Sequence, residues 1–145
     1  MSKAFTKEDD AGAPAERFVP ELSLPPGAKN YVTPAGLAAY RAALATETEP
    51  RKQAELARRI ERAEVVDPAT QETDRVRFGL VVTVDTPTGS RTYQIVGIDE
   101  AEPRAGRVSW MSPIARALLD AAVGDVVGWQ QGELGVVEIR RPQRS

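Results

Sequence analysis

The sequence of 145 residues contains no cysteine and no histidine. This absence excludes disulfide bonds, thiolate chemistry, the usual zinc sites and the commonest general base of enzymes. Neither sign of charge is in excess, because 19 basic and 21 acidic residues leave a net charge of −2. A general attraction to nucleic acid or to an anionic membrane is therefore excluded, and any such contact must be local.

Long apolar runs are also missing. No stretch approaches the roughly 18 apolar residues that a membrane-spanning helix needs, and the first residues lack the apolar core of a signal peptide. We therefore expect a soluble cytoplasmic protein that does not contact the membrane, with no cofactor and no bound metal. Because 41% of the residues are hydrophobic, the chain is long enough for one core with a helical appendage.

Residues 1–29 mix charged residues, alanine, glycine and four prolines without helical or strand periodicity, which predicts a disordered tail. Residues 30–66 predict a short antiparallel helical hairpin. Thr33 and Pro34 provide an N-cap and a first helical residue, and Pro50 opens a second helix with the spacing of a narrow coiled-coil seam.

In residues 67–145 the apolar residues recur with the period of β-strands, which predicts a second structural region. Val76 to Asp85 alternate as a strand, and the turn at 86–90 leads into a returning strand. Ser112 and Pro113 repeat the signal for a helix start, and two final strands follow that helix. The predicted fold class is α+β: a helical hairpin, then an antiparallel sheet with one inserted helix.

Several phrases occur in the order and spacing of one known family. They are MSKAFTKEDD at 1–10, KNYVTPAG at 29–36, VVD at 65–67, YQIVGIDE at 93–100, VSWMSPIARALL at 108–119 and VGD at 123–125. In these phrases the chain resembles the GreA/GreB transcription elongation factors, particularly the GreB type, and the short-armed Rnk-type relatives are similar.

The resemblance implies a fold and a partner. The C-terminal region would be an FKBP-like domain that docks on the coiled coil of the largest RNA polymerase subunit, at the rim of the secondary channel. An N-terminal coiled-coil arm would enter that channel, where two acidic residues at the arm's tip help to hold a catalytic magnesium ion in the polymerase. Carboxylates suit this task because magnesium prefers hard oxygen ligands.

The arm departs from the family pattern, because the acidic tip phrase of the long-armed factors is missing between Thr33 and Val65. Helices of about 14 residues reach only roughly 20 Å. Glu47 and Glu49 fall at the predicted tip, either as a displaced acidic pair or simply as turn and helix-start residues beside Pro50. We expect no cleavage stimulation, because so short an arm does not bring a carboxylate to the metal ion in the polymerase, whatever charge its tip carries.

The family's docking loop has an Asp-Ser-Pro or Asn-Ser-Pro phrase, and here methionine replaces its first residue. Trp110 is either a core anchor or an interface aromatic, and strand alternation predicts that either it or Met111 is exposed. Ser112 and Pro113 either only cap the helix or also dock. The resemblance implies the following polymerase-binding residues: Trp110, Met111, Ser112, Pro113 and Arg116.

The second helix of the hairpin carries several basic residues, similar to the basic patch with which Gre arms approach RNA. Acidic residues are interleaved, so a merely solvated face is the alternative. The candidate RNA-facing residues are Arg51, Lys52, Arg58, Arg59 and Arg62.

These observations favour a non-enzymatic, Gre-like regulator of transcription elongation that binds RNA polymerase and competes with full-length Gre factors, without sequence-specific DNA binding. The alternatives are a cleavage-stimulating factor acting through Glu47 and Glu49, a prolyl isomerase, or a toxin-like or structural hairpin module. The isomerase rests on the FKBP-like fold alone, and fold does not determine function. Two tryptophans, three tyrosines and three phenylalanines are also few for an aromatic proline pocket.

Overall fold

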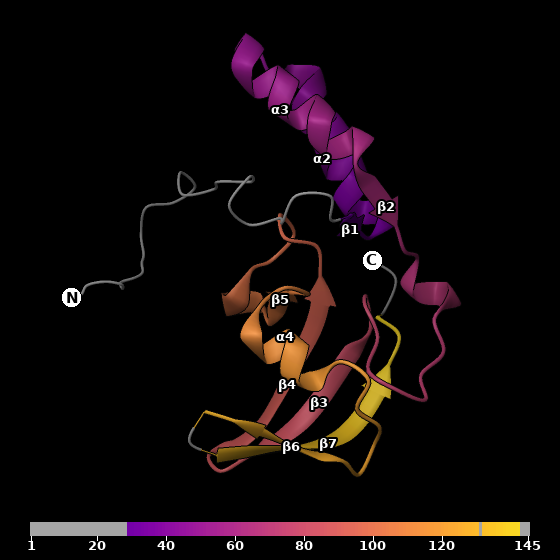
Figure 1. The fold of residues 1–145 in the computed structure, drawn as a ribbon, viewed down its shortest axis with the longest axis vertical. Coiled ribbons are helices and arrows are strands. Elements are labelled where there is room, and N and C mark those ends of the chain that lie inside the picture. The colour runs from indigo at the N-terminus through magenta and orange to yellow at the C-terminus, as the bar shows by residue number, and fades with distance from the viewer. Residues whose placement is uncertain (1–28, 131, 143–145) are drawn as a thin grey trace, which may run out of the picture.

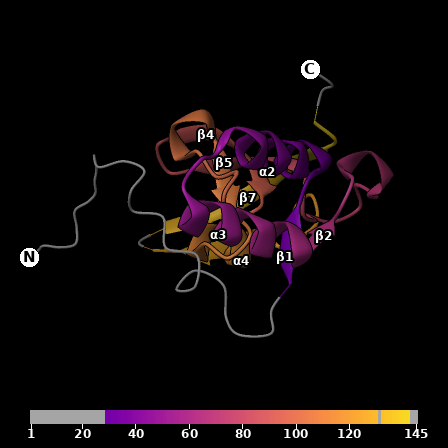
Figure 2. The ribbon, with the colours of Figure 1, turned by 90° about the horizontal axis from the view of Figure 1, so that it is seen from above.

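The computed structural model describes residues 29–130 and 132–142. Apart from Lys29, the predicted tail of residues 1–29 lies outside the described residues. The described chain combines helices and a sheet, as the sequence predicts, and the sheet is curled. A pair of helices projects as an arm from one end of the sheet domain (Figures 1 and 2).

The arm consists of α2 (Pro34–Thr46) and α3 (Pro50–Glu61), which lie side by side (Figure 1). Helix α2 begins where its cap predicts, because the Oγ1 atom of Thr33 accepts a hydrogen bond of 3.1 Å from the amide of Gly36. Pro50 opens α3 after a turn of three residues. The capping threonine and the opening proline therefore fix where the two helices of the arm begin.

A small parallel ladder closes the base of the arm. It pairs β1 (Asn30–Val32) with β2 (Ala63–Val65), and the amide of Val66 extends it with a bond of 2.8 Å to the carbonyl of Val32. The sequence does not predict these strands, because three-residue segments carry too little periodicity. The ladder joins the two ends of the helical hairpin and so defines one base for the arm.

The larger sheet has five strands in the order β5-β4-β3-β7-β6. They are β3 (Val81–Thr86), β4 (Gly89–Val96), β5 (Arg107–Ser109), β6 (Val126–Trp129) and β7 (Gly132–Arg140). The prediction of an antiparallel sheet is wrong for one pair, because β4 and β5 run parallel. The connection of residues 97–106, which contains the 3₁₀ turn η3 (Pro103–Ala105), returns the chain to the start of the next strand.

Helix α4 (Pro113–Leu118) covers one face of this sheet (Figure 1). It has six residues, and it places Ala115 and Leu118, both fully buried, against the sheet. The sheet contributes Val82, Val84, Ile95 and Val136 to the same core. Burying one such aliphatic side chain contributes about 1.5–3 kcal/mol, so this core stabilises the domain largely by itself.

The strand predicted from Val76 begins only at Val81. Residues before it contain the 3₁₀ turn η2 (Pro68–Thr70) and irregular backbone. Val76 is buried, but its amide and carbonyl pair with the backbone of residues 120 and 121 instead of the sheet. Gly79 then turns the chain with a positive φ of 89°, which a continuing strand does not allow.

Replacing Gly79 with alanine should lower the free energy of unfolding by about 2 kcal/mol, since the positive φ is strained and the new Cβ would lie near Pro68. The distance from that Cβ to Cγ of Pro68 would be 2.8 Å. Urea unfolding followed by tryptophan fluorescence measures the change. Gly128→Ala is the control, because a Cβ there meets nothing within 4 Å. Equal losses in both variants would contradict the explanation.

Candidate functional site

The predicted docking loop, residues 111–113, is held by its own hydrogen bonds. The amide of Met111 donates to Oγ of Ser109 over 3.0 Å, and the hydroxyl of Ser112 donates to the carbonyl of Ser109 over 2.6 Å. Oγ of Ser112 also accepts from the amide of Ala115 over 3.3 Å, which confirms the predicted cap of α4. Pro113 and Arg116 are exposed, so the start of α4 presents a fixed surface to solvent.

Trp110 and Met111 are both half-buried, so the prediction that one of them is exposed is wrong. Strand β5 ends at Ser109, and the alternation of a strand does not extend to the next two residues. The ring of Trp110 packs edge to face on Tyr31 in β1, with centroids 5.1 Å apart. Trp110 thus joins the docking loop to the base of the arm.

The two acidic residues at the arm's tip have local partners. The Glu47 carboxylate accepts a hydrogen bond of 3.1 Å from the amide of Glu49, and its carbonyl accepts one of 2.6 Å from the Gln53 side chain. The Glu49 carboxylate lies 3.7 Å from Nζ of Lys52. These contacts fit the interpretation that both residues shape the turn and the start of α3.

One member of the predicted basic face does not belong to it. Arg59 is only 7% exposed and forms an ion pair with Asp99, so the prediction that it faces RNA is wrong. A helix of period 3.6 turns this position toward the sheet domain, while its neighbours point outward. The residues that remain on the exposed side are Arg51, Lys52, Arg58 and Arg62.

The ion pair between Arg59 and Asp99 belongs to a polar network, here called the joint, where the arm meets the sheet domain. The Asp99 carboxylate accepts hydrogen bonds from the Arg59 guanidinium and from the Tyr40 hydroxyl. The side-chain amide of Asn30 donates to the Tyr40 hydroxyl over 3.1 Å and to the carbonyl of Arg59 over 3.2 Å. One carboxylate therefore ties both helices to the loop after β4.

Glu100 forms the second half of the joint. Its Oε2 atom accepts hydrogen bonds of 3.0 Å from the amides of Thr33 and Gly97, and Oε1 accepts one from the Thr33 hydroxyl. The carboxylate also lies at the N-terminus of α2, where the helix dipole favours negative charge. A Cβ at Gly36 would stand 2.5 Å from Cδ of Glu100, so glycine permits this close approach.

Sequence reasoning assigned no role to Asn30, Tyr40, Asp99 or Glu100. The pair Asp99 and Glu100 lies in the phrase YQIVGIDE, which carries the family resemblance, but their partners are 40 to 67 positions away along the chain. A buried partner at that separation leaves no periodic signal in one sequence. The resemblance of this phrase was the only signal that marked the loop.

The joint changes the acid–base chemistry of Tyr40. Burial, and then the hydrogen bond to Asp99, raise the pKa of its phenol well above the ordinary value. A phenolate there would be desolvated and would face the Asp99 carboxylate. Tyr40 therefore remains a hydrogen-bond donor.

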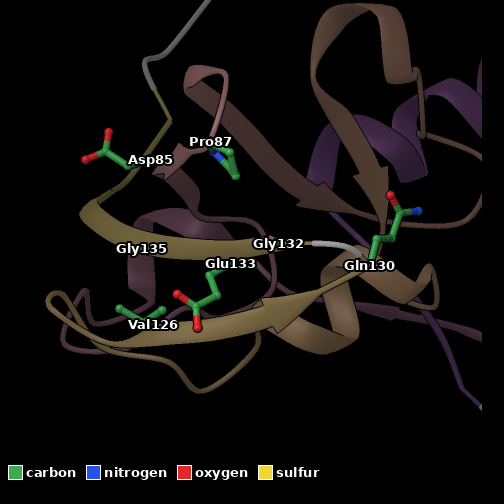
Figure 3. Close-up of a pocket in the computed structure, with 7 residues that line it drawn as sticks. All are labelled: Asp85, Pro87, Val126, Gln130, Gly132, Glu133 and Gly135. Atoms are coloured by element: carbon green, nitrogen blue, oxygen red, sulfur yellow. The ribbon is translucent and has the colours of Figure 1, made fainter.

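A hollow lies at the end of the sheet domain, between the turn that joins β3 to β4 and the hairpin of β6 and β7 (Figure 3). Asp85, Pro87, Val126 and Glu133 are among its lining residues, and its carboxylates belong to Asp85 and Glu133. None of the candidate docking or tip residues lines it. Across residues 29–130 and 132–142, histidine, cysteine and acidic side chains do not gather in threes to form a metal site.

Within the same described ranges, no helix has the length and apolar character needed to cross a lipid bilayer.

Residues 71–141 match the family model described as "Transcription elongation factor, GreA/GreB, C-term". This range contains the docking loop, α4 and all five strands of the sheet domain. The chain is 51% identical over 70 residues to transcription elongation factor GreA of Mesorhizobium japonicum, and 51% identical over 75 residues to that of Methylobacterium nodulans. Residues 71–141 are a C-terminal domain of the GreA/GreB family.

The matches cover 47% and 50% of this chain and 45% and 48% of these relatives, so the chain spans about half the length of each. Among solved structures, a GreA/GreB factor from Nitrosomonas europaea is 22% identical with a TM-score of 0.44, covering 77% of this chain and 98% of that one. Gfh1 of Thermus thermophilus is also 22% identical, with a TM-score of 0.41 and coverages of 77% and 99%. The family match begins after the arm, which ends before residue 71.

The raised pKa of Tyr40 predicts a loss of stability in alkali. The native state holds the phenolic proton to higher pH than the unfolded chain, so stability is complete below the ordinary phenol pKa of about 10 and falls above it. In Tyr40→Phe the free energy of unfolding should fall less steeply above that pH. Urea unfolding at a series of pH values measures both slopes. Identical alkaline slopes in the two proteins would contradict the prediction.

Proposed function

We propose that this protein is a Gre-like elongation factor that binds RNA polymerase at the rim of the secondary channel and modulates elongation in the cytoplasm without stimulating transcript cleavage. The match of residues 71–141 to the GreA/GreB C-terminal domain carries this proposal. The FKBP-like character of the sheet domain and the coiled coil of the largest polymerase subunit as its docking partner belong to the same proposal.

The start of α4 supports the docking role. Ser112 and its backbone partners fix the loop before polymerase binds, so little conformational entropy is lost on docking. Pro113 and Arg116 are exposed beside the half-buried Met111. A methionine at the position where the family has a polar residue offers an adaptable apolar contact.

The arm supports a role without cleavage. Helix α2 has 13 residues and α3 has 12, so the arm extends only roughly 20 Å at about 1.5 Å per residue. Its tip carboxylates are engaged by the Glu49 amide and by Lys52. A short arm that occupies the channel rim also supports competition with full-length Gre factors for the same docking surface.

If the start of α4 docks on RNA polymerase, reversing an exposed charge on this helix should weaken binding. Arg116→Glu should weaken binding to purified core RNA polymerase by about tenfold, because it reverses an exposed charge beside the docking loop. Fluorescence anisotropy with the full chain measures the affinity. Arg91→Glu, an exposed reversal on β4, is the matched control and should bind normally. Undetectable binding by the wild-type chain would rule out the proposed partner.

The absence of cleavage predicts that backtracked complexes release no more short RNA when the protein is added. The alternative, cleavage through Glu47 and Glu49, requires a stimulation that Glu47→Gln with Glu49→Gln abolishes. Gel analysis of stalled complexes, with a full-length Gre factor as positive control, separates the two. Stimulated cleavage that is lost in the double variant would establish the alternative.

A further inference from the structure

The buried residues of the arm helices all lie at the joint. In α2 they are Gly36 and Tyr40, and in α3 the buried residue is Arg59. Each contacts Asp99 or Glu100, whereas the described helical residues nearer the tip are half-buried or exposed. Isolated helices of this length are marginal in water. The arm therefore depends on the loop after β4 more than on a core of its own.

The joint holds α2 at two points. Glu100 binds Thr33 at the start of the helix, and Asp99 binds Tyr40 seven residues later. At about 1.5 Å per residue these points are roughly 10 Å apart along the helix axis, so together they define a direction. Asp99 also binds Arg59 in α3, which prevents rotation of the helix pair about that axis.

Aromatic packing connects the same base to the docking loop. Tyr31 in β1 lies 6.2 Å from Phe78 and 5.1 Å from Trp110, measured between ring centroids. Trp110 directly precedes Met111, the first residue of the docking loop. The direction of the arm is thus set relative to the surface that the proposed function assigns to docking.

We propose that Asp99 and Glu100 are positioning residues that hold the arm in one direction relative to the docking loop, and that this direction, rather than docking affinity, determines the effect on transcription. The second half of this inference rests on the proposed function. The first half concerns the protein alone and is tested separately.

Carboxylates suit this task because their hydrogen bonds are directional and charge-assisted. Apolar contacts of the same area would allow the helices to slide, whereas Oδ2 of Asp99 and both carboxylate oxygens of Glu100 have donors at fixed places. An amide at position 99 would remove the negative charge that now pairs with the buried Arg59 guanidinium. An amide at position 100 would turn an NH₂ group toward amides or a hydroxyl that now donate to the carboxylate.

The first test measures the arm's direction in the intact protein. Because the chain has no cysteine, spin labels attach only at introduced sites: Thr48→Cys at the arm's tip and Ser90→Cys at the start of β4. Double electron–electron resonance should give one narrow distance distribution. In Asp99→Asn and in Glu100→Gln its width should increase by about twofold or more, because local opening frees the arm.

Glu102→Gln is the matched control, since this exposed carboxylate of the same connection pairs with Arg107 over 2.6 Å and does not touch the arm. Its distribution should stay narrow. Tyr40→Phe removes one joint donor while keeping the ring, and it should broaden the distribution with the helical circular dichroism unchanged. Unchanged widths in the joint variants would overturn the inference. Loss of the helical signal in all of them would also overturn it, since the joint would then only fold the arm.

The second test compares binding with effect in purified transcription complexes. Asp99→Asn and Glu100→Gln should bind core polymerase within about twofold of wild type, and so compete normally with Gre factors, but should change the rate of elongation by about fivefold less than wild type does. If the variants affect elongation as strongly as wild type although their distance distribution is broadened, arm direction does not determine the effect on transcription, and only the positioning role stands.

If wild-type protein does not bind polymerase, both the proposed function and the connection between arm direction and transcription are refuted. The spin-label result alone would then decide the positioning role.

Discussion

Two adjacent carboxylates, Asp99 and Glu100, are the point on which the arrangement of this protein depends. Burying a charge costs free energy unless an opposite charge or hydrogen-bond partners compensate it, and the Asp99 carboxylate pairs with the buried guanidinium of Arg59. An ion pair such as that between Asp99 and Arg59 adds little net stability compared with apolar packing. Its strength lies in selecting one geometry, because another orientation of the arm would separate Arg59 from Asp99 and Thr33 from Glu100.

The two parts of the molecule are therefore stabilised by different forces. The sheet domain has an apolar core between α4 and strands such as β3 and β4. The arm has polar and charged anchors at its base, together with the contacts of Tyr31 with Phe78 and Trp110. The consequence is a stable domain that carries an appendage whose direction depends on a few hydrogen bonds.

Local chemistry made part of this structure predictable. The caps at Thr33 and Ser112 act over three residues, so a single sequence reveals them. The parallel pairing of β4 with β5 and the burial of Arg59 depend on contacts between distant segments. A basic residue among other basic residues looks solvent-exposed in sequence, and only the loop after β4 distinguishes Arg59 from Arg58.

Within the proposed function, a long arm and a short arm would act in different ways. A long arm acts chemically, because it carries carboxylates to a metal, and that requires reach before anything else. Here the tip residues Glu47 and Glu49 are used in the turn itself. Under the proposed function an arm of roughly 20 Å would act by occupying space near its base, so its direction would matter more than the chemistry of its tip. In keeping with this, the buried residues of the arm helices lie at the joint rather than at the tip.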